Sequence, residues 1–481
     1  MDMIVTETNT YASQVISAIQ DPARRQRASE AWTPTTRTEI NAYIATVLWS
    51  GVVQLAAWDD YWKKDTRQPF MADLFSRMRW QQLTHYIHFG RNDLQGSGDP
   101  LYKIRALIDV LNQNFKKHWC LHLVLVLDEG MVPSKSRRNP FRQVVKGKPH
   151  PCGIKLFELC DKGNYCFHFE VYTGNKGWDG PHVGLSSDIV YLFLAVVPGR
   201  PGEHIWLLDN WYTSISLFRQ LNAQVLLVIS SSLSPSPSFT SFSYISHPWQ
   251  GYLIIGAFRN DRPTELWQGL QTKLDNKKLK RGELQWAMAI DAELAAVSWR
   301  DAGFVNIVSN FIDPEITLPS QRWRSPKEAR AARGQALVAY QLPKCVRFYR
   351  DNVHHVDTFN STVMALRTRH RSRKYYIPLW WSLLKMAVAN AWAMQRSNHK
   401  KNGLGDTTQK DFIKRLCVQL AADHRQATAT PPPAQHWPVL QDRAQVCVSC
   451  LLRGSRSNTK FCCEGCDKFI HPRCWAEWHN R

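Results

Sequence analysis

Three aspartates lie at positions where mixed α/β folds usually carry catalytic or binding residues. Asp128 ends the predicted strand LVLVLD, Asp209 ends IWLLD, and Asp357 precedes a long predicted helix. Because adjacent parallel strands end at one edge of a sheet, we expect these carboxylates to gather there. Gathered carboxylates repel one another, and Mg²⁺ or Mn²⁺ would balance their charge. Asp after a strand is also common in turns, so an ordinary structural role stays open on spacing alone.

The end of the chain carries a second set of candidate ligands. Six of the 12 cysteines lie in the last 35 residues. Thiolates two residues apart can bind one tetrahedral Zn²⁺ ion, so the spacing predicts one or two Zn²⁺ ions in an interleaved arrangement like that of RING or PHD modules. Cys462 is an alternative to its neighbour Cys463. The predicted ligands are Cys447, Cys450, Cys463, Cys466, His471, Cys474 and His479.

Composition indicates a globular protein with an acidic partner. The chain has 481 residues, a net charge of +21 and 44% hydrophobic residues. Such an excess of positive charge favours nucleic acid or an anionic membrane surface, although a merely basic soluble protein is the plain alternative. Neither a secretory signal nor a membrane-spanning segment is expected, and we predict a nuclear location.

Hydrophobic spacing divides the chain into elements. Helices are predicted at 38–55, 71–89 and 101–119, after a polar start (1–36) without a core pattern. A mixed α/β region follows, with a hairpin turn at 161–164. Its strands are predicted at 121–128, 154–161, 165–174 and 203–210, and its helices at 183–199 and 214–224.

The second half of the chain is less regular. A Ser- and Pro-rich run at 228–252 is predicted to be a loop or disordered insertion, and retained non-coding sequence is an alternative. Residues 253–320 have a β-rich, basic pattern, and 376–396 a helical one. A Pro-rich linker is expected between 403 and 440.

Several segments resemble piggyBac-type transposases. LDEGMVPSKSRRNPFRQVVKGKPHPCGIKLF (127–157) resembles the first signature of that family, and LLDNWYTSISLFRQL (207–221) the second. YRDNVHHVDTFNSTV (349–363) resembles the third, and 61–93 the helical region before the catalytic core. The resemblance covers roughly residues 40–400 and the Cys-rich tail, which corresponds to a family domain that binds transposon-end DNA.

The resemblance implies an RNase H-like core that cuts and joins DNA with two Mg²⁺ ions. It makes Asp128, Asp209 and Asp357 the catalytic acids, with Asn360 beside them. Two departures from the family pattern are His354-His355 in place of Gly-Gly, and Asn360 in place of a further Asp. An Asn oxygen binds a hard cation without charge, so metal affinity should be weaker. Arg137, Lys148 and Lys155 become candidates for contacting the DNA backbone.

The resulting fold class is α/β: an RNase H-like core, a helical N-terminal region, a β-rich insertion and a small C-terminal zinc domain. We predict a DNA transposase that acts as a homodimer on double-stranded transposon ends and target DNA. The alternative is a catalytically weakened, transposase-derived DNA- or chromatin-binding protein. A zinc-finger adaptor, through histone-tail reading or ubiquitin-ligase recruitment, would leave the carboxylates unexplained. The domains are predicted at 1–120 (helical, DNA-binding and dimerising), 121–225 and 345–400 (core), 226–344 (insertion), 401–443 (linker) and 444–481 (zinc domain).

Overall fold

The computed structural model of the chain covers most of its length. Four predicted site residues lie outside the part that it describes: Arg137, Lys148, Cys466 and His479. So does the Ser- and Pro-rich run, apart from Tyr252. The described residues are 1–94, 96, 98–134, 136, 139–145, 151–174, 184–221, 252–258, 279–289, 294–323, 337–367, 372, 374–428, 438–463, 468–475 and 478.

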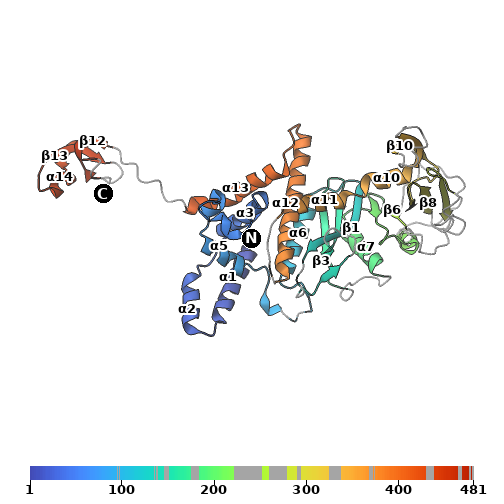
Figure 1. The fold of residues 1–481 in the computed structure, drawn as a ribbon, viewed down its shortest axis with the longest axis horizontal. Helices are drawn as coiled ribbons and strands as arrows, with labels where there is room; N and C mark the ends of the chain where they lie inside the picture. The colour runs from blue at the N-terminus through green and yellow to red at the C-terminus, as the bar shows by residue number, and fades with distance from the viewer. Residues whose placement is uncertain are drawn as a thin grey trace, which may run out of the picture.

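Helices precede the first strand, as predicted (Figure 1). The helix expected at 71–89 is in fact two helices, because the Ser76 side chain accepts a hydrogen bond from the Arg79 N–H and starts a new helix there. The helices are α1 (Asp2–Ser17), α2 (Pro22–Ala31), α3 (Arg37–Val52), α4 (Pro69–Ala72), α5 (Arg77–Tyr86) and α6 (Arg105–Lys117).

The expectation that residues 1–36 lack a core pattern is wrong. Helix α1 buries a stripe at every fourth position, which is narrow because two of its members are small. Helix α2 follows after Asp21, whose side chain accepts hydrogen bonds from the backbone N–H groups of Ala23 and Arg24. The buried residues of α1 are Ile4, Thr8, Ala12 and Ile16.

A nine-stranded mixed sheet forms the centre of the described chain. Its order is β2–β3–β1–β5–β6–β9–β8–β7, with β4 paired to β3. Strand β1 pairs in parallel with β5, and β5 in parallel with β6. The strands are β1 (Val124–Pro133), β2 (Arg142–Val144), β3 (Cys152–Asp161), β4 (Cys166–Val171), β5 (Ile205–Leu208), β6 (Leu253–Ala257), β7 (Leu284–Ala289), β8 (Leu294–Arg300) and β9 (Phe304–Ser309).

The predicted hairpin at 161–164 is confirmed, because β3 and β4 are antiparallel on either side of it. Strand β1 differs from its prediction. It was expected to end at Asp128, yet it continues to Pro133 and pairs with β3 throughout. Asp128 and Glu129 therefore both lie within the strand, and their side chains point to opposite faces of the sheet.

Helices cover both faces of the sheet (Figure 1). Helix α7 (Leu185–Val196) and the helical residues 215–221 pack on one face, where they contribute Phe193 and Phe218 to the core. The other face packs against α6, α11 (His355–Ala365) and α12 (Tyr376–Lys401). This arrangement buries both faces, which explains why its strands are nearly continuous apolar runs.

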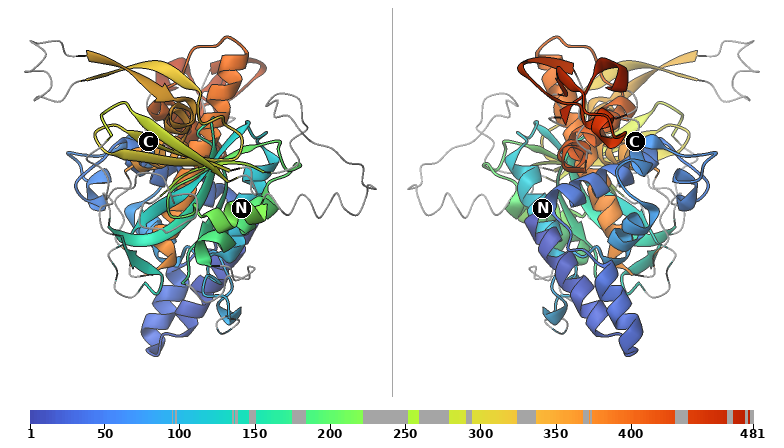
Figure 2. Two further views of the ribbon diagram at one scale, coloured as in Figure 1. Left: turned by 90° about the vertical axis from the view of Figure 1, so that its right-hand side faces the viewer. Right: turned by 90° about the vertical axis from the view of Figure 1, so that its left-hand side faces the viewer.

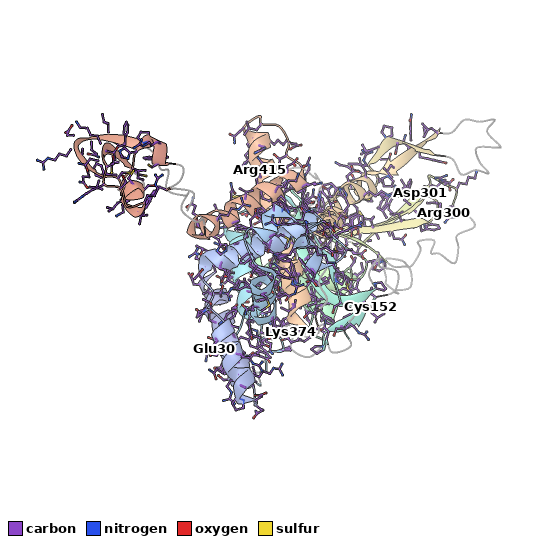
Figure 3. The ribbon with its side chains drawn as sticks, turned by 60° about the vertical axis from the view of Figure 1, so that its left-hand side comes forward. Glu30, Cys152, Arg300, Asp301, Lys374 and Arg415 are labelled. Carbon is purple, nitrogen blue, oxygen red and sulfur yellow. The ribbon has the colours of Figure 1, made fainter. Side chains whose placement is uncertain are left out.

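The β-rich part expected at 253–320 extends this sheet at the β6 side. Beyond it, β10 (Thr317–Trp323) and β11 (Leu337–Pro343) form a separate two-stranded ribbon (Figure 2). Asp301, labelled in Figure 3, accepts hydrogen bonds from Arg281 at 3.1 Å and Arg350 at 3.2 Å. Because Arg350 belongs to α10 (Lys344–Asn352), this ion pair ties the β-rich end to the helix that leads into α11.

The stretch expected to be a linker, 401–443, contains α13 (Gln409–Thr428), which packs against α3. Ile413, Cys417 and Ala421 are buried at four-residue spacing. The Pro-rich composition that suggested a linker belongs to only the second half of this stretch, whereas its first half carries a helical pattern.

The Cys-rich tail has a small sheet of its own, in the order β12–β13–β14. It is formed by β12 (Pro438–Val446), β13 (Asn458–Cys463) and β14 (Lys468–Phe469), with α14 (Val448–Leu452) after β12. Within the described residues, no helix combines the length and the apolar character that crossing a membrane requires.

Candidate active site and metal centre

Two of the three predicted catalytic acids lie side by side. In the parallel pair β1–β5, Leu127 lies opposite Leu208, so Asp128 and Asp209 are the next residues on adjacent strands. Both side chains are half-buried. The sequence prediction that these strands are neighbours and parallel is therefore confirmed.

The segment 209–214 forms a tight turn that holds Asp209 in place. The Asp209 carbonyl accepts hydrogen bonds from the backbone N–H groups of Tyr212 and Thr213, and from the Thr213 hydroxyl at 3.0 Å. Ser214 then caps the helix that follows, because its hydroxyl accepts from the Leu217 N–H. Gly256 on β6 leaves room for Thr213, since a Cβ atom there would lie 2.2 Å from the Thr213 hydroxyl.

Helix α11 carries the third acid across β1 and β3. Its buried side includes Val356 and Phe359, whereas Asp357 is exposed and Asn360 is half-buried. At the helix start, His355 Nδ1 lies 3.0 Å from Asn164 Oδ1, in the β3–β4 turn. Because an amide oxygen only accepts, Nδ1 carries the proton. Burial is the largest cause that lowers the pKa of His355, to about 4, and His354 adds to it.

A fourth carboxylate, Glu158 on β3, was missed at the level of sequence. Glu158 lies directly opposite Asp128 in the antiparallel pair, and only 1% of it is exposed. Directly opposite residues point to the same face, which here is the face that α11 covers. A lone charged residue inside the apolar strand IKLFELCD was the available signal.

The pKa values of Tyr212 and Tyr349 indicate that negative charge is concentrated around Asp128 and Asp209. Burial raises the pKa of Tyr212 well above its ordinary value, and the nearby carboxylates Glu129, Asp128, Asp209 and Glu158 raise it further. The pKa of Tyr349 is raised by burial and then by Asp209 and Asp128. The Tyr349 hydroxyl donates to the Leu208 carbonyl at 3.2 Å, which ties α10 to the end of β5.

Lys155, a predicted DNA contact, is engaged within the protein. Its Nζ lies 2.5 Å from Glu129 Oε1 and 4.4 Å from the centre of the Trp211 ring. The Lys155 side chain is 14% exposed and that of Glu129 is 17% exposed. This ion pair explains how β1 can carry Glu129 on the sheet face opposite to Asp128.

The carboxylates do not form a ready-made ligand set. Among the described residues, the single group of three or more His, Cys, Asp or Glu side chains that could hold one metal ion lies in the tail. Asp128 and Asp209 are adjacent by register, and Asp357 lies on the exposed side of α11. A cation between them would have to draw Asp357 inward.

Four predicted zinc ligands converge in the tail. One ligand atom from each of these residues lies within 4.8 Å of the others. Cys450 Sγ is 3.4 Å from His471 Nδ1 and 3.7 Å from Cys474 Sγ. His471 Nε2 lies 3.0 Å from the Asn458 carbonyl, which can only accept, so the Nδ1 lone pair faces the sulfurs. The four are Cys447, Cys450, His471 and Cys474.

The surroundings favour negatively charged sulfur at Cys447, whereas desolvation and the neighbouring thiols Cys474 and Cys447 raise the pKa of Cys450. Burial opposes ionisation of Cys447, but backbone N–H groups of His471 and Cys450 outweigh it and lower the pKa of Cys447 to about 6. Arg453 Nη2 donates to Cys474 Sγ at 2.9 Å, a contact that the sequence did not predict. Three thiolates and a neutral imidazole are a donor set that suits Zn²⁺.

The predicted ligands include three pairs, Cys447/Cys450, Cys463/Cys466 and His471/Cys474. The group of four consists of the first and third of these pairs. Cys463 is fully buried beside them but outside the group of four, and Cys462 is buried too. Two other predicted ligands, Cys466 and His479, lie outside the described residues. This choice of pairs agrees with the interleaved arrangement that the sequence predicted.

Comparisons with known proteins agree on one family. Residues 1–392 match the family model described as Transposase IS4. PiggyBac transposable element-derived protein 2 of Homo sapiens is 23% identical over 495 residues, with 100% of this chain and 74% of that protein covered. PiggyBac transposable element-derived protein 3 of Homo sapiens is 22% identical over 468 residues, with 92% of this chain and 70% of that protein covered.

A solved structure has a similar fold. A cryo-EM structure described as a piggyBac transposase synaptic complex with hairpin DNA gives a TM-score of 0.68. The match covers 98% of this chain and 93% of the other, at 18% identity. The mixed α/β fold described above is thus shared with that transposase.

Proposed function

Because the chain belongs to the piggyBac family of transposases, we propose that it cuts and joins DNA by metal-assisted transesterification of phosphodiesters. The observation that carries this proposal is the register of β1 and β5, which sets Asp128 beside Asp209 under the helix of Asp357. In this proposal the three aspartates hold the divalent ions, and Asn360 lies at the edge of the site.

The donor set suits Mg²⁺ or Mn²⁺. Its members are carboxylate oxygens; after burial, Glu129 and then Asp128, Asp209 and Glu158 raise the pKa of Tyr212, which shows that negative charge is concentrated there. Two bound ions supply activation of a water or 3′-hydroxyl nucleophile and stabilise the leaving oxygen. The protein's own part is to fix Asp128 and Asp209 through strand register, and to hold Asp357 on α11 above them.

The architecture that we propose is an RNase H-like core, formed by residues 121–225 and 345–400. The helical region 1–120 precedes this core, and the insertion 226–344 interrupts it. Strand β6 lies inside the range predicted for the insertion, yet it continues the parallel set of the core sheet, so we propose that the core also includes β6 and that the inserted part follows it. Residues 401–443 contain α13 and lead into the tail.

For the tail, residues 444–481, we propose a zinc domain that contacts DNA. Cys447, Cys450, His471 and Cys474 would hold one Zn²⁺, and the remaining predicted ligands a second. The basic residues Arg453, Arg456, Lys460, Lys468 and Arg473 are in the same segment and favour phosphate contacts.

Double-stranded DNA is the partner that the charge of +21 supports. We propose transposon ends and target DNA as its two substrates, and a homodimer, since two ends must be paired. A protein with these substrates would act in the nucleus. Arg137 and Lys148 stay candidates for backbone contacts, whereas Lys155 would first have to leave Glu129.

A second candidate function is DNA or chromatin binding without cutting. Two observations favour it: Asp357 is exposed, and Asn360 stands where the family pattern has a further acid. A chain of this kind would keep the fold and the basic charge but hold divalent ions weakly.

A nicking assay separates the two functions. The purified chain and an Asp209→Ala variant are incubated with Mg²⁺ and a duplex that carries the terminal repeats flanking the coding element, beside a scrambled duplex. Nicking of the terminal duplex by the native chain alone supports the transposase. Binding of that duplex by both proteins without nicking supports the binding protein.

A further inference from the structure

The hydrogen-bonded pair Glu158–Asn360 joins two elements of the proposed active site. Asn360 Nδ2 donates to Glu158 Oε2 at 2.7 Å. Asn360 lies on α11, three residues after Asp357, and Glu158 lies on β3, opposite Asp128. One hydrogen bond therefore runs from the helix of the third acid to the strand neighbour of the first.

The absence of a side chain at Gly130 leaves space for the Glu158 carboxylate. Gly130 is on the same face as Asp128, two residues further along β1. A Cβ atom on Gly130 would lie 2.5 Å from Glu158 Oε1 and 2.7 Å from Oε2. Any larger residue at this position would push the carboxylate away from Asn360.

Two polar contacts bracket Asp357 along α11. His355 reaches Asn164 in the β3–β4 turn at 3.0 Å, and Asn360 reaches Glu158 at 2.7 Å. Helical geometry places Asp357 about 60° around the helix from Asn360, on its solvent side. The two contacts thus fix helix α11, which carries Asp357, both in its rotation about its axis and in its position along that axis.

We propose that Glu158 is a positioning residue of the active site, which holds α11 through Asn360 and so sets Asp357 over Asp128 and Asp209. This inference rests on the proposed function. In it, Asn360 is complementary to Glu158: an Asp at position 360 would set two buried carboxylates against each other. The charge that the family pattern carries at position 360 would here be on the neighbouring strand.

A charge-swap cycle tests the pairing. The variants are Glu158→Gln, Asn360→Asp and the double variant, in which a Gln amide at 158 donates to an Asp at 360. We expect Asn360→Asp, which sets two carboxylates against each other, to lower the nicking rate and Mn²⁺ affinity by roughly 10- to 100-fold, the usual cost of losing a partner that orients a ligand. We expect Glu158→Gln to lower them less, because the Gln oxygen still accepts from Asn360 Nδ2. We expect the double variant to recover to within about threefold of the native chain. Glu30→Gln on the exposed helix α2 (Figure 3) is the matched control.

Hydrogen exchange separates failure of this inference from failure of the proposed function. Amide exchange of residues 355–365, measured without metal or DNA, should speed up in Asn360→Asp, change little in Glu158→Gln, and slow again in the double variant. If the native chain neither nicks nor binds Mn²⁺, the proposed function fails, and positioning of a catalytic site fails with it, whatever the exchange shows. If the native chain nicks but the double variant is no better than the worse single variant, the positioning role of Glu158 is refuted and the transposase stands.

Discussion

The carboxylate site and the Cys-rich tail differ in how far their ligands have already converged. Between residues 447 and 474, four ligand atoms lie within 4.8 Å of one another. Between residues 128 and 357, strand register brings two aspartates together while the third stays exposed. Thiols can approach one another closely because they form weak hydrogen bonds, and N–H donors such as that of Arg453 balance negative charge on sulfur, whereas ionised carboxylates repel one another and need a cation. The difference in convergence is therefore a property of the donor chemistry as well as of the fold.

The largest effect should come from removing the Zn²⁺ proposed for the tail. Because so small a module has little apolar core, metal binding should supply about 10 kcal/mol or more of its folding free energy. We expect a strong chelator, or Cys450→Ser, to unfold residues 438–475 and to leave the helices and the main sheet folded. Hydrogen exchange along the whole chain measures this, with Cys120→Ser at an exposed thiol as the control. Unchanged exchange in the tail after chelation would show that thiol packing alone holds it.

The next largest effect should be at the carboxylate site. If Asp128 and Asp209 hold divalent ions, losing one of them should remove several kcal/mol of transition-state stabilisation. We expect Asp209→Ala to lower the nicking rate on the order of 10³-fold with little change in duplex binding. The rate and the dissociation constant are measured on the same terminal duplex. Equal loss of binding and cutting would instead make Asp209 a structural residue of the turn.

A smaller effect should follow from filling the space at Gly130. Gly130→Ala would displace the Glu158 carboxylate, and we expect it to lower the free energy of unfolding by about 1–3 kcal/mol. The nicking rate should fall with it. Thermal unfolding measures the free energy of unfolding, and Gly405→Ala, where the added Cβ atom would meet nothing within 4 Å, is the control. A Gly130→Ala variant with native stability and rate would mean that Glu158 moves freely.

The smallest effect concerns pH and the helices that support α12. Burial is the largest cause that lowers the pKa of His88 to about 4, and Lys103 and Lys374 add to it, while the hydrogen bond with Asn92 opposes it. As pH falls from about 6.5 toward 4, the unfolded chain takes up a proton that the folded chain does not, so stability falls. We expect His88→Gln to flatten that part of the pH profile of thermal unfolding. The same slope in both proteins would assign it to other groups.

The sequence predicted those features that depend on local residue patterns. The apolar run before Asp128 predicted a strand, and the run before Asp209 predicted its parallel neighbour. The extension of β1 past Glu129 was not predictable in this way, because its cation, Lys155, is remote in sequence and reaches it only in the folded sheet. Glu158 was missed for the same reason: its partner, Asn360, lies about 200 residues further on.

The missed helices have a different cause. The stripe of α1 includes Thr8 and Ala12, and that of α13 includes Cys417 and Ala421, so neither stripe has strong apolar contrast. Both helices become stable through packing on α3 and its neighbours, which residue patterns do not reveal. The convergence of Cys447, Cys450, His471 and Cys474 was predicted from the sequence, because paired Cys and His residues at this spacing are brought together by local turns.

The parallel pairing of β5 with β6 has a consequence for engineering the site. Gly256 on β6 leaves room for the Thr213 hydroxyl, and Thr213 donates to the Asp209 carbonyl, so the register of β6 reaches Asp209 through two contacts. A larger residue at position 256 would therefore displace Asp209 without altering any carboxylate, which offers a way to tune the spacing of the two aspartates.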